Sequence, residues 1–130
     1  MTWLLRTRAA LMAVVLIGVA AARTAAVDAS GIWTSEFDSD IGRQQYRYEF
    51  AVKGTTLTGT ATGSVVGESE IEDGKAEGNT VSFTERGRFM GSDFRIEYVG
   101  TMTSADEIRF ERRVIGLVST TETIVAKRQK

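Results

Sequence analysis

The feature that most constrains this chain is a two-residue alternation of large apolar side chains with polar or small ones. Between Gln44 and Lys53 every second residue is large and apolar, and the residues between are charged or small; the apolar positions are Tyr46, Tyr48, Phe50 and Val52. Because successive side chains of a β-strand point to opposite faces, the alternation predicts a strand with one buried face. After residue 26 we find no segment with helical periodicity. The chain is therefore expected to fold as an all-β protein.

The same alternation recurs in eight short segments separated by clusters of Gly, Asp, Ser and Asn. The predicted strands are 31–37, 44–53, 56–64, 68–75, 80–86, 93–102, 107–114 and 121–128. Short strands joined in sequence by short loops predict an eight-stranded antiparallel up-and-down barrel, because closing the sheet covers every apolar face and removes exposed edges. A two-sheet sandwich uses the same kind of strand and is the alternative fold.

The segment 53–63, KGTTLTGTATG, combines three glycines with five threonines. Gly54 and Gly59 have the spacing of the first half of a phosphate-binding loop. The lysine and hydroxyl that complete such a loop are replaced by Thr60 and Ala61, and no helix follows, which excludes a nucleotide site. The segment is better explained as one strand of a β-hairpin.

A two-residue type II′ turn at Gly54-Thr55 would fix the register of that hairpin. The resulting pairs are Lys53 with Thr56, Val52 with Leu57, Phe50 with Gly59, Tyr48 with Ala61 and Tyr46 with Gly63. Large inward residues then face small ones, so we expect the glycines to make room for the rings.

The first 26 residues have the pattern of a secretory signal peptide. Arg6 and Arg8 precede an apolar run from Ala9 to Ala22, and the candidate cleavage sites lie at Ala22, Ala26 and Ala29. The run of 14 residues is shorter than the roughly 20 needed to span a membrane, which leaves an uncleaved anchor as the alternative. We expect a secreted or periplasmic protein without a stable membrane anchor, with a signal peptide at 1–26 and one β-barrel domain at 27–130.

The composition limits the available chemistry. The chain has no Cys and no His, which excludes disulfides, thiolate nucleophiles, Ser-His-Asp triads and imidazole metal ligands. The first 26 residues hold three arginines and no acid, which leaves 13 basic against 17 acidic side chains in the remainder. An acidic domain with interspersed charges predicts no nucleic-acid partner.

One acidic stripe could be taken for a metal site. Glu68, Glu70 and Glu72 alternate along one strand with Asp73 beside them, but they lack the full ligand series of a calcium loop. We interpret the stripe as a solvated surface and predict neither a metal site nor a cofactor.

Nine aromatic residues fall on the predicted inward faces: Trp33, Phe37, Tyr46, Tyr48, Phe50, Phe83, Phe94, Tyr98 and Phe110. An eight-stranded barrel encloses room for side chains or for one small ligand. Either the rings fill the interior, or space remains near four small residues, Ser35, Ala61, Gly63 and Gly100. In the second case the buried tyrosine hydroxyls would be the polar groups of the pocket.

Gly31-Ile32-Trp33 is similar to the G-x-W that opens calycin barrels, the lipocalin and avidin-like group. This resemblance implies that Arg128, at the end of the last strand in "TIVAKR", packs across Trp33 at the closed end of the barrel. Avidin-like biotin sites use tryptophans from later strands, and this chain has none after Trp33, so biotin is not the expected ligand.

Over nearly all of its mature length the chain resembles small secreted bacterial domains of lipocalin-like type, which occur alone or appended to exported glycoside hydrolases. The shared features are glycine turns, barrel aromatics and the closing arginine. The resemblance implies the fold and supplies no catalytic residues.

These observations predict a secreted, non-catalytic barrel that binds a small apolar or carbohydrate-like ligand. The expected ligand-binding residues are Tyr46, Tyr48, Tyr98, Trp33 and Arg128. The oligomeric state is left open.

Two other functions remain as alternatives. An interaction or accessory domain of extracellular polysaccharide-degrading systems predicts an exposed apolar patch, for which the best candidate is VIGLV at 114–118. A cofactor-free barrel isomerase predicts a buried carboxylate near the tyrosines, although we expect no acid on the inward faces.

Overall fold

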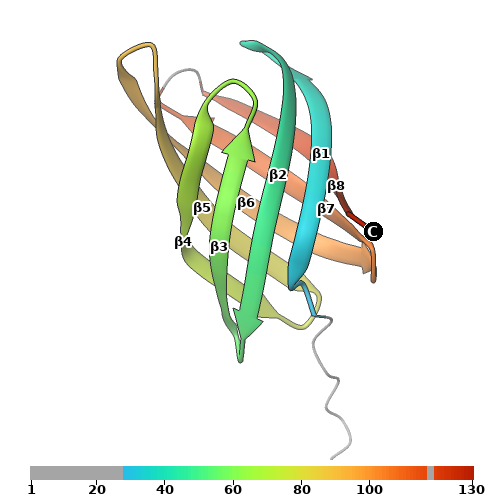
Figure 1. Ribbon diagram of the computed structural model, residues 1–130. Coiled ribbons are helices and arrows are strands. Elements are labelled where there is room, and N and C mark those ends of the chain that lie inside the picture. The colour runs from blue at the N-terminus through green and yellow to red at the C-terminus, as the bar shows by residue number, and fades with distance from the viewer. Residues whose placement is uncertain (1–27, 117–118) are drawn as a thin grey trace, which may run out of the picture.

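The computed structural model describes residues 28–116 and 119–130, so the predicted signal peptide lies outside the described residues. The described chain is a closed, eight-stranded antiparallel barrel in which each strand pairs with the next and β8 pairs with β1 (Figure 1). The strands are β1 (Gly31–Ser39), β2 (Gly42–Lys53), β3 (Thr56–Gly63), β4 (Gly67–Glu77), β5 (Thr80–Phe89), β6 (Ser92–Ser104), β7 (Glu107–Ile115) and β8 (Thr120–Arg128). The up-and-down barrel is confirmed and the sandwich is excluded.

The hairpin of β2 and β3 has the predicted register. Phe50 lies opposite Gly59, and Tyr46 lies opposite Gly63. Gly54 has a φ of 65°, as the first position of a type II′ turn requires. A Cβ added to Gly63 would lie 2.7 Å from the ring of Tyr46, so this glycine does make room for a ring.

Gly59 is needed for a different reason from the one predicted. Its φ is 147°, and an added Cβ would collide with the backbone carbonyl of Glu49 on β2. The glycine therefore allows the β2 and β3 backbones to approach each other, next to an irregularity in the β3–β4 pairing. The expectation that it makes room for the Phe50 ring is wrong.

Aromatic rings fill most of the barrel interior. All nine predicted inward aromatics are buried, and Phe83 stacks on Tyr98 with ring centroids 4.3 Å apart. The ring of Phe110 occupies the space beside Gly100, where an added Cβ would lie 2.4 Å from it. Of the two alternatives, the filled interior applies beside both glycines, because the rings of Tyr46 and Phe110 occupy that space.

Trp33 and Arg128 close one end of the barrel, which we call the foot. The guanidinium lies 4.4 Å from the ring centroid of Trp33, as the resemblance implied. It donates hydrogen bonds to the carbonyls of Ser30 at 2.6 Å and Ala105 at 2.9 Å. A Cβ on Gly31 would lie 2.7 Å from Arg128 Nη1, so the glycine of G-x-W leaves space for the arginine.

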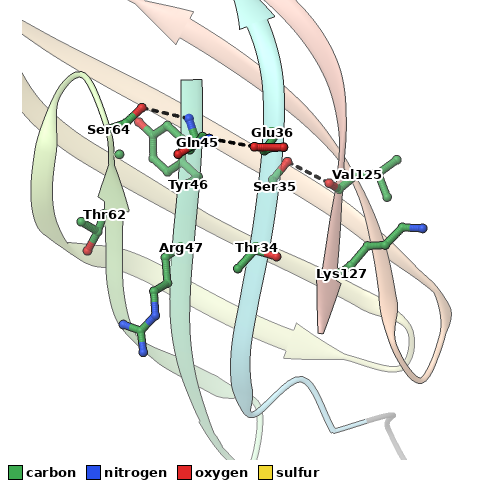
Figure 2. Close-up of a pocket in the computed structure, with 11 residues that line it drawn as sticks. Thr34, Ser35, Glu36, Gln45, Tyr46, Arg47, Thr62, Ser64, Val125 and Lys127 are labelled. Carbon is green, nitrogen blue, oxygen red and sulfur yellow. Dashed lines mark hydrogen bonds between the residues drawn. The ribbon is translucent and has the colours of Figure 1, made fainter. Parts of the chain in front are cut away.

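The junction of β1 and β8, which we call the seam, is paired only near the foot. Its register partners are Trp33 with Arg128 and Thr34 with Lys127. One residue further from the foot, Ser35 Oγ donates a hydrogen bond of 2.8 Å to the Val125 carbonyl (Figure 2). A side chain thus takes the place of a backbone donor where the two strands begin to separate.

Candidate functional site

A network of buried polar side chains crosses the interior on the side of the aromatic core away from the foot. Tyr46 and Tyr48 come from β2, Glu85 from β5 and Tyr98 from β6, and each is exposed by 2% or less. The hydroxyls of Tyr46 and Tyr98 each donate a 2.8 Å hydrogen bond to the Glu85 carboxylate. Tyr48 donates to the Tyr98 hydroxyl at 3.2 Å. One buried carboxylate therefore orders three tyrosines.

Arg112 of β7 connects this network to a second carboxylate. Its Nε donates to the Tyr98 hydroxyl at 3.0 Å and its Nη2 to the Tyr46 hydroxyl at 3.2 Å. Its Nη1 forms a 2.7 Å ion pair with Glu122 of β8. Because Tyr46 and Tyr98 each accept from the arginine and donate to Glu85, the hydrogen bonds around the carboxylate have a defined direction.

The electrostatics of the network follow from its burial. Burial raises the pKa of Glu85, and this outweighs the hydrogen bonds from Tyr46 and Tyr98 and the nearby charge of Arg112, which lower it. Burial, followed by the charge of Glu85, also raises the pKa of Tyr46. The tyrosine hydroxyls therefore stay neutral and act as hydrogen-bond donors to the carboxylate.

The sequence predicted only part of this network. The three tyrosines come together as expected. Trp33 lies on β1 opposite Tyr48 but donates its hydrogen bond to the Ala29 carbonyl, and Arg128 covers it at the foot, so neither joins the network. Glu85 and Arg112 were missed, and the expectation that the inward faces carry no acid is wrong. Their positions in the alternation could have placed both residues on the inward face. Glu85 continues the inward series of Val81 and Phe83, and Arg112 continues the series of Ile108 and Phe110.

A small cavity of about 30 Å³ lies between Arg112 and the end of the barrel opposite the foot, which we call the mouth. Its walls are mainly apolar, formed by Ile41, Val66, Phe94, Ile96 and Val114, and the ion pair of Arg112 and Glu122 also lines it. Glu85 and the tyrosines are not among its lining residues. Arg112 therefore separates the cavity from the buried carboxylate.

Gln44 presents an unpaired acceptor beside this cavity. The side chain lines the cavity and is 2% exposed. Its Nε2 donates a 2.7 Å hydrogen bond to Ser39 Oγ, but its Oε1 has no partner among the described residues. A buried acceptor left unpaired costs about 1–3 kcal/mol, and the adjacent space is large enough for a water-sized polar group. A bound molecule with a donor would satisfy it.

A shallow groove of about 760 Å³ lies on the outer wall, across β8, β1, β2 and β3 (Figure 2). The charged side chains that line it, Glu36, Arg47 and Lys127, are already paired. Gln45 donates to Glu36 at 2.8 Å, and Arg47 forms an ion pair of 2.9 Å with Glu49 on the same strand. These charged groups are exposed and have partners, so the groove offers no unpaired charge to a ligand.

The segment proposed as an apolar interaction patch is only partly described. Val114 is buried and lines the cavity, so its predicted exposure is wrong. Leu117 and Val118 lie outside the described residues. The large apolar side chains that are exposed in the described parts of the chain are Met90 and Val99.

The arrangement can bind a small molecule more readily than it can transform one. Glu85 is the buried carboxylate, and it is 1% exposed and hydrogen-bonded to two tyrosines. The cavity contacts Arg112 and Gln44, which can orient a guest by hydrogen bonds. No family model, curated protein or solved structure matches this chain.

Proposed function

We propose that this protein is a secreted, non-catalytic, lipocalin-like barrel that binds a small molecule at its mouth. The observation that carries this proposal is the cavity beside Gln44, where apolar walls surround a buried acceptor without a partner. Binding sites typically combine apolar walls with a few placed polar groups. The rest of the interior is filled by rings, so the guest enters only the outermost part of the barrel.

The isomerase alternative gains one specific observation. It requires a buried carboxylate near the tyrosines, and Glu85 lies 2.8 Å from the hydroxyls of Tyr46 and Tyr98. A general base must reach the proton that it removes, directly or through one water. Glu85 does not line the cavity, and Arg112 stands between them. The present geometry therefore favours binding over proton transfer.

Native mass spectrometry of the protein purified from its own source tests the proposal. We expect a small molecule to be retained without a covalent bond. Val66→Trp should displace it by filling the mouth, because Val66 lines the cavity. Val99→Trp is the matched control, since Val99 is 58% exposed on the outer wall and the change should leave the adduct in place.

Two results would contradict this function. One is a bare protein mass under gentle ionisation together with a crystal structure in which the mouth contains only side chains. The other is an adduct that survives Val66→Trp but is lost in Val99→Trp, which would place the guest on the outer wall.

A further inference from the structure

The proposed mouth site has no free positive charge to offer an anion. Arg112 is the cation that lines the described cavity, and its Nη1 already holds Glu122 at 2.7 Å. Its Nε and Nη2 are directed at the two tyrosines that donate to Glu85. A carboxylate or phosphate entering the cavity would approach Glu122, and it would lose its hydration without gaining an unpaired cation.

The amide orientation of Gln44 determines which polar group is missing a partner. Ser39 Oγ lies 3.0 Å from the Gly42 carbonyl, to which it donates its single proton. It can therefore only accept from the Gln44 amide, which assigns Nε2 to the 2.7 Å contact. Oε1 is therefore the amide atom without a hydrogen-bond partner among the described residues. Because it is an acceptor, a guest must bring an O–H or N–H donor to pair with it.

The size of the cavity limits what reaches Gln44. A volume of about 30 Å³ holds one small polar group and excludes a ring. The walls nearest the outside come from two turns, with Ile41 between β1 and β2 and Val66 between β3 and β4. A guest can therefore insert one small head group and rest an apolar body against these two side chains.

We propose, building on the binding function above, that the mouth selects neutral molecules carrying a hydroxyl head group on an apolar body. The hydroxyl donates to Gln44 Oε1, and the body packs against Ile41 and Val66. Carboxylates of the same size are rejected because Glu122 already occupies Arg112. Aliphatic cations are rejected because the lining does not compensate the loss of their hydration: Glu122 is already paired with Arg112, and Asp40, the other acid of the lining, is exposed to solvent.

Three probes with the same six-carbon body test this selectivity: 1-hexanol, hexanoate and hexylammonium, at neutral pH. Binding is followed by NMR titration, using the Gln44 side-chain amide and the methyl groups of Ile41 and Val66. We expect 1-hexanol to bind about ten-fold more tightly than hexanoate, which has no donor for Gln44 Oε1; this is the factor typical of one buried hydrogen bond made or lost. Hexylammonium keeps a donor but loses the hydration of its charge, so it should also bind more weakly than 1-hexanol.

The variant Gln44→Met keeps the length of the side chain and removes the acceptor. It should weaken 1-hexanol binding about ten-fold and abolish the preference over hexanoate. Gln45→Met is the matched control, because Gln45 is the neighbouring glutamine on the exposed face of β2. It should leave all three affinities unchanged.

The outcomes separate this inference from the function on which it rests. Hexanoate binding at the mouth as tightly as 1-hexanol, or Gln44→Met binding 1-hexanol as well as the parent does, overturns the hydroxyl selectivity and leaves a ligand-binding mouth intact. If Gln44 holds only a water molecule that no probe displaces, the selectivity is also overturned. If, in addition, the purified protein carries no adduct, the binding function fails as well.

Discussion

At the scale of single residues, Glu85 links the fold to pH. Its pKa in the folded protein is raised above the ordinary value of 4.5 by burial. At a pH between 4.5 and the raised pKa of the folded state, the folded chain holds the proton of Glu85 more tightly than the unfolded chain does. The contribution of Glu85 to stability is therefore fully present below about pH 4.5 and is lost as the pH rises through this window.

Glu85→Gln removes this dependence. The difference in free energy of unfolding, parent minus variant, should fall as the pH increases from about 4 to about 7. Urea titrations at intervals across that range measure it. A difference that stays constant, or that grows with pH, would show that the folded pKa of Glu85 is not raised.

Arg112 and Arg113 are neighbours on β7 with opposite environments. The Arg112 side chain is 2% exposed, whereas that of Arg113 is 66% exposed. Arg112→Met leaves Glu122 without its cation and removes one hydrogen bond from each of two tyrosines, and it should lower the free energy of unfolding by about 3–5 kcal/mol. Arg113→Met should lower it by less than about 1 kcal/mol. Equal effects in urea denaturation would argue against the buried network.

At the scale of strands and turns, the β2–β3 hairpin allows a test of why Gly59 is glycine. Gly59→Ala should destabilise the protein by about 1–3 kcal/mol, because the new Cβ meets the backbone of Glu49 at a φ of 147°. Combining it with Phe50→Leu distinguishes the two explanations. A backbone collision is not relieved by the smaller side chain, so the two losses should add. Substantial rescue in the double variant would instead implicate the ring.

The strands were predictable because their alternation is regular, and the Gly54-Thr55 turn was enough to fix one register. Glu85 and Arg112 were missed because an alternation of apolar residues defines the inward phase without showing which polar residues share it. Gly59 was misread because sequence spacing places residues opposite each other without giving the distance between the two backbones. Nor does spacing reveal that Gly59 lies in the segment where the pairing of β3 with β4 shifts register.

For the whole molecule, closure of the barrel depends on the foot. Arg128 joins β8 to the carbonyls of Ser30 and Ala105 and covers Trp33. Arg128→Met should lower the free energy of unfolding by about 2 kcal/mol, through lost hydrogen bonds and the lost cation–π contact. Lys127→Met, on the exposed face of the same strand, is the control and should have little effect. Circular dichroism during urea denaturation measures both.

The cavity is a property of the whole molecule, and the sequence did not locate it. It requires the turn residues Ile41 and Val66 to approach β6 and β7, which are distant in sequence. Composition alone suggested space where small residues gather, but the rings of Tyr46 and Phe110 cover those positions. The unfilled space lies instead between Arg112 and the mouth of the barrel.

The directional hydrogen bonds around Glu85 also disfavour barrels in which a strand has slipped in register. Sliding one strand by two residues would keep an alternating inward face, so apolar packing alone discriminates weakly against slipped barrels. The network draws on β2, β5, β6, β7 and β8. A slip in any of these five strands would bury a charge or a hydroxyl without its partner. A mispaired barrel would therefore be several kcal/mol less stable than the native one. Only the native register leaves every proton in the network with an acceptor.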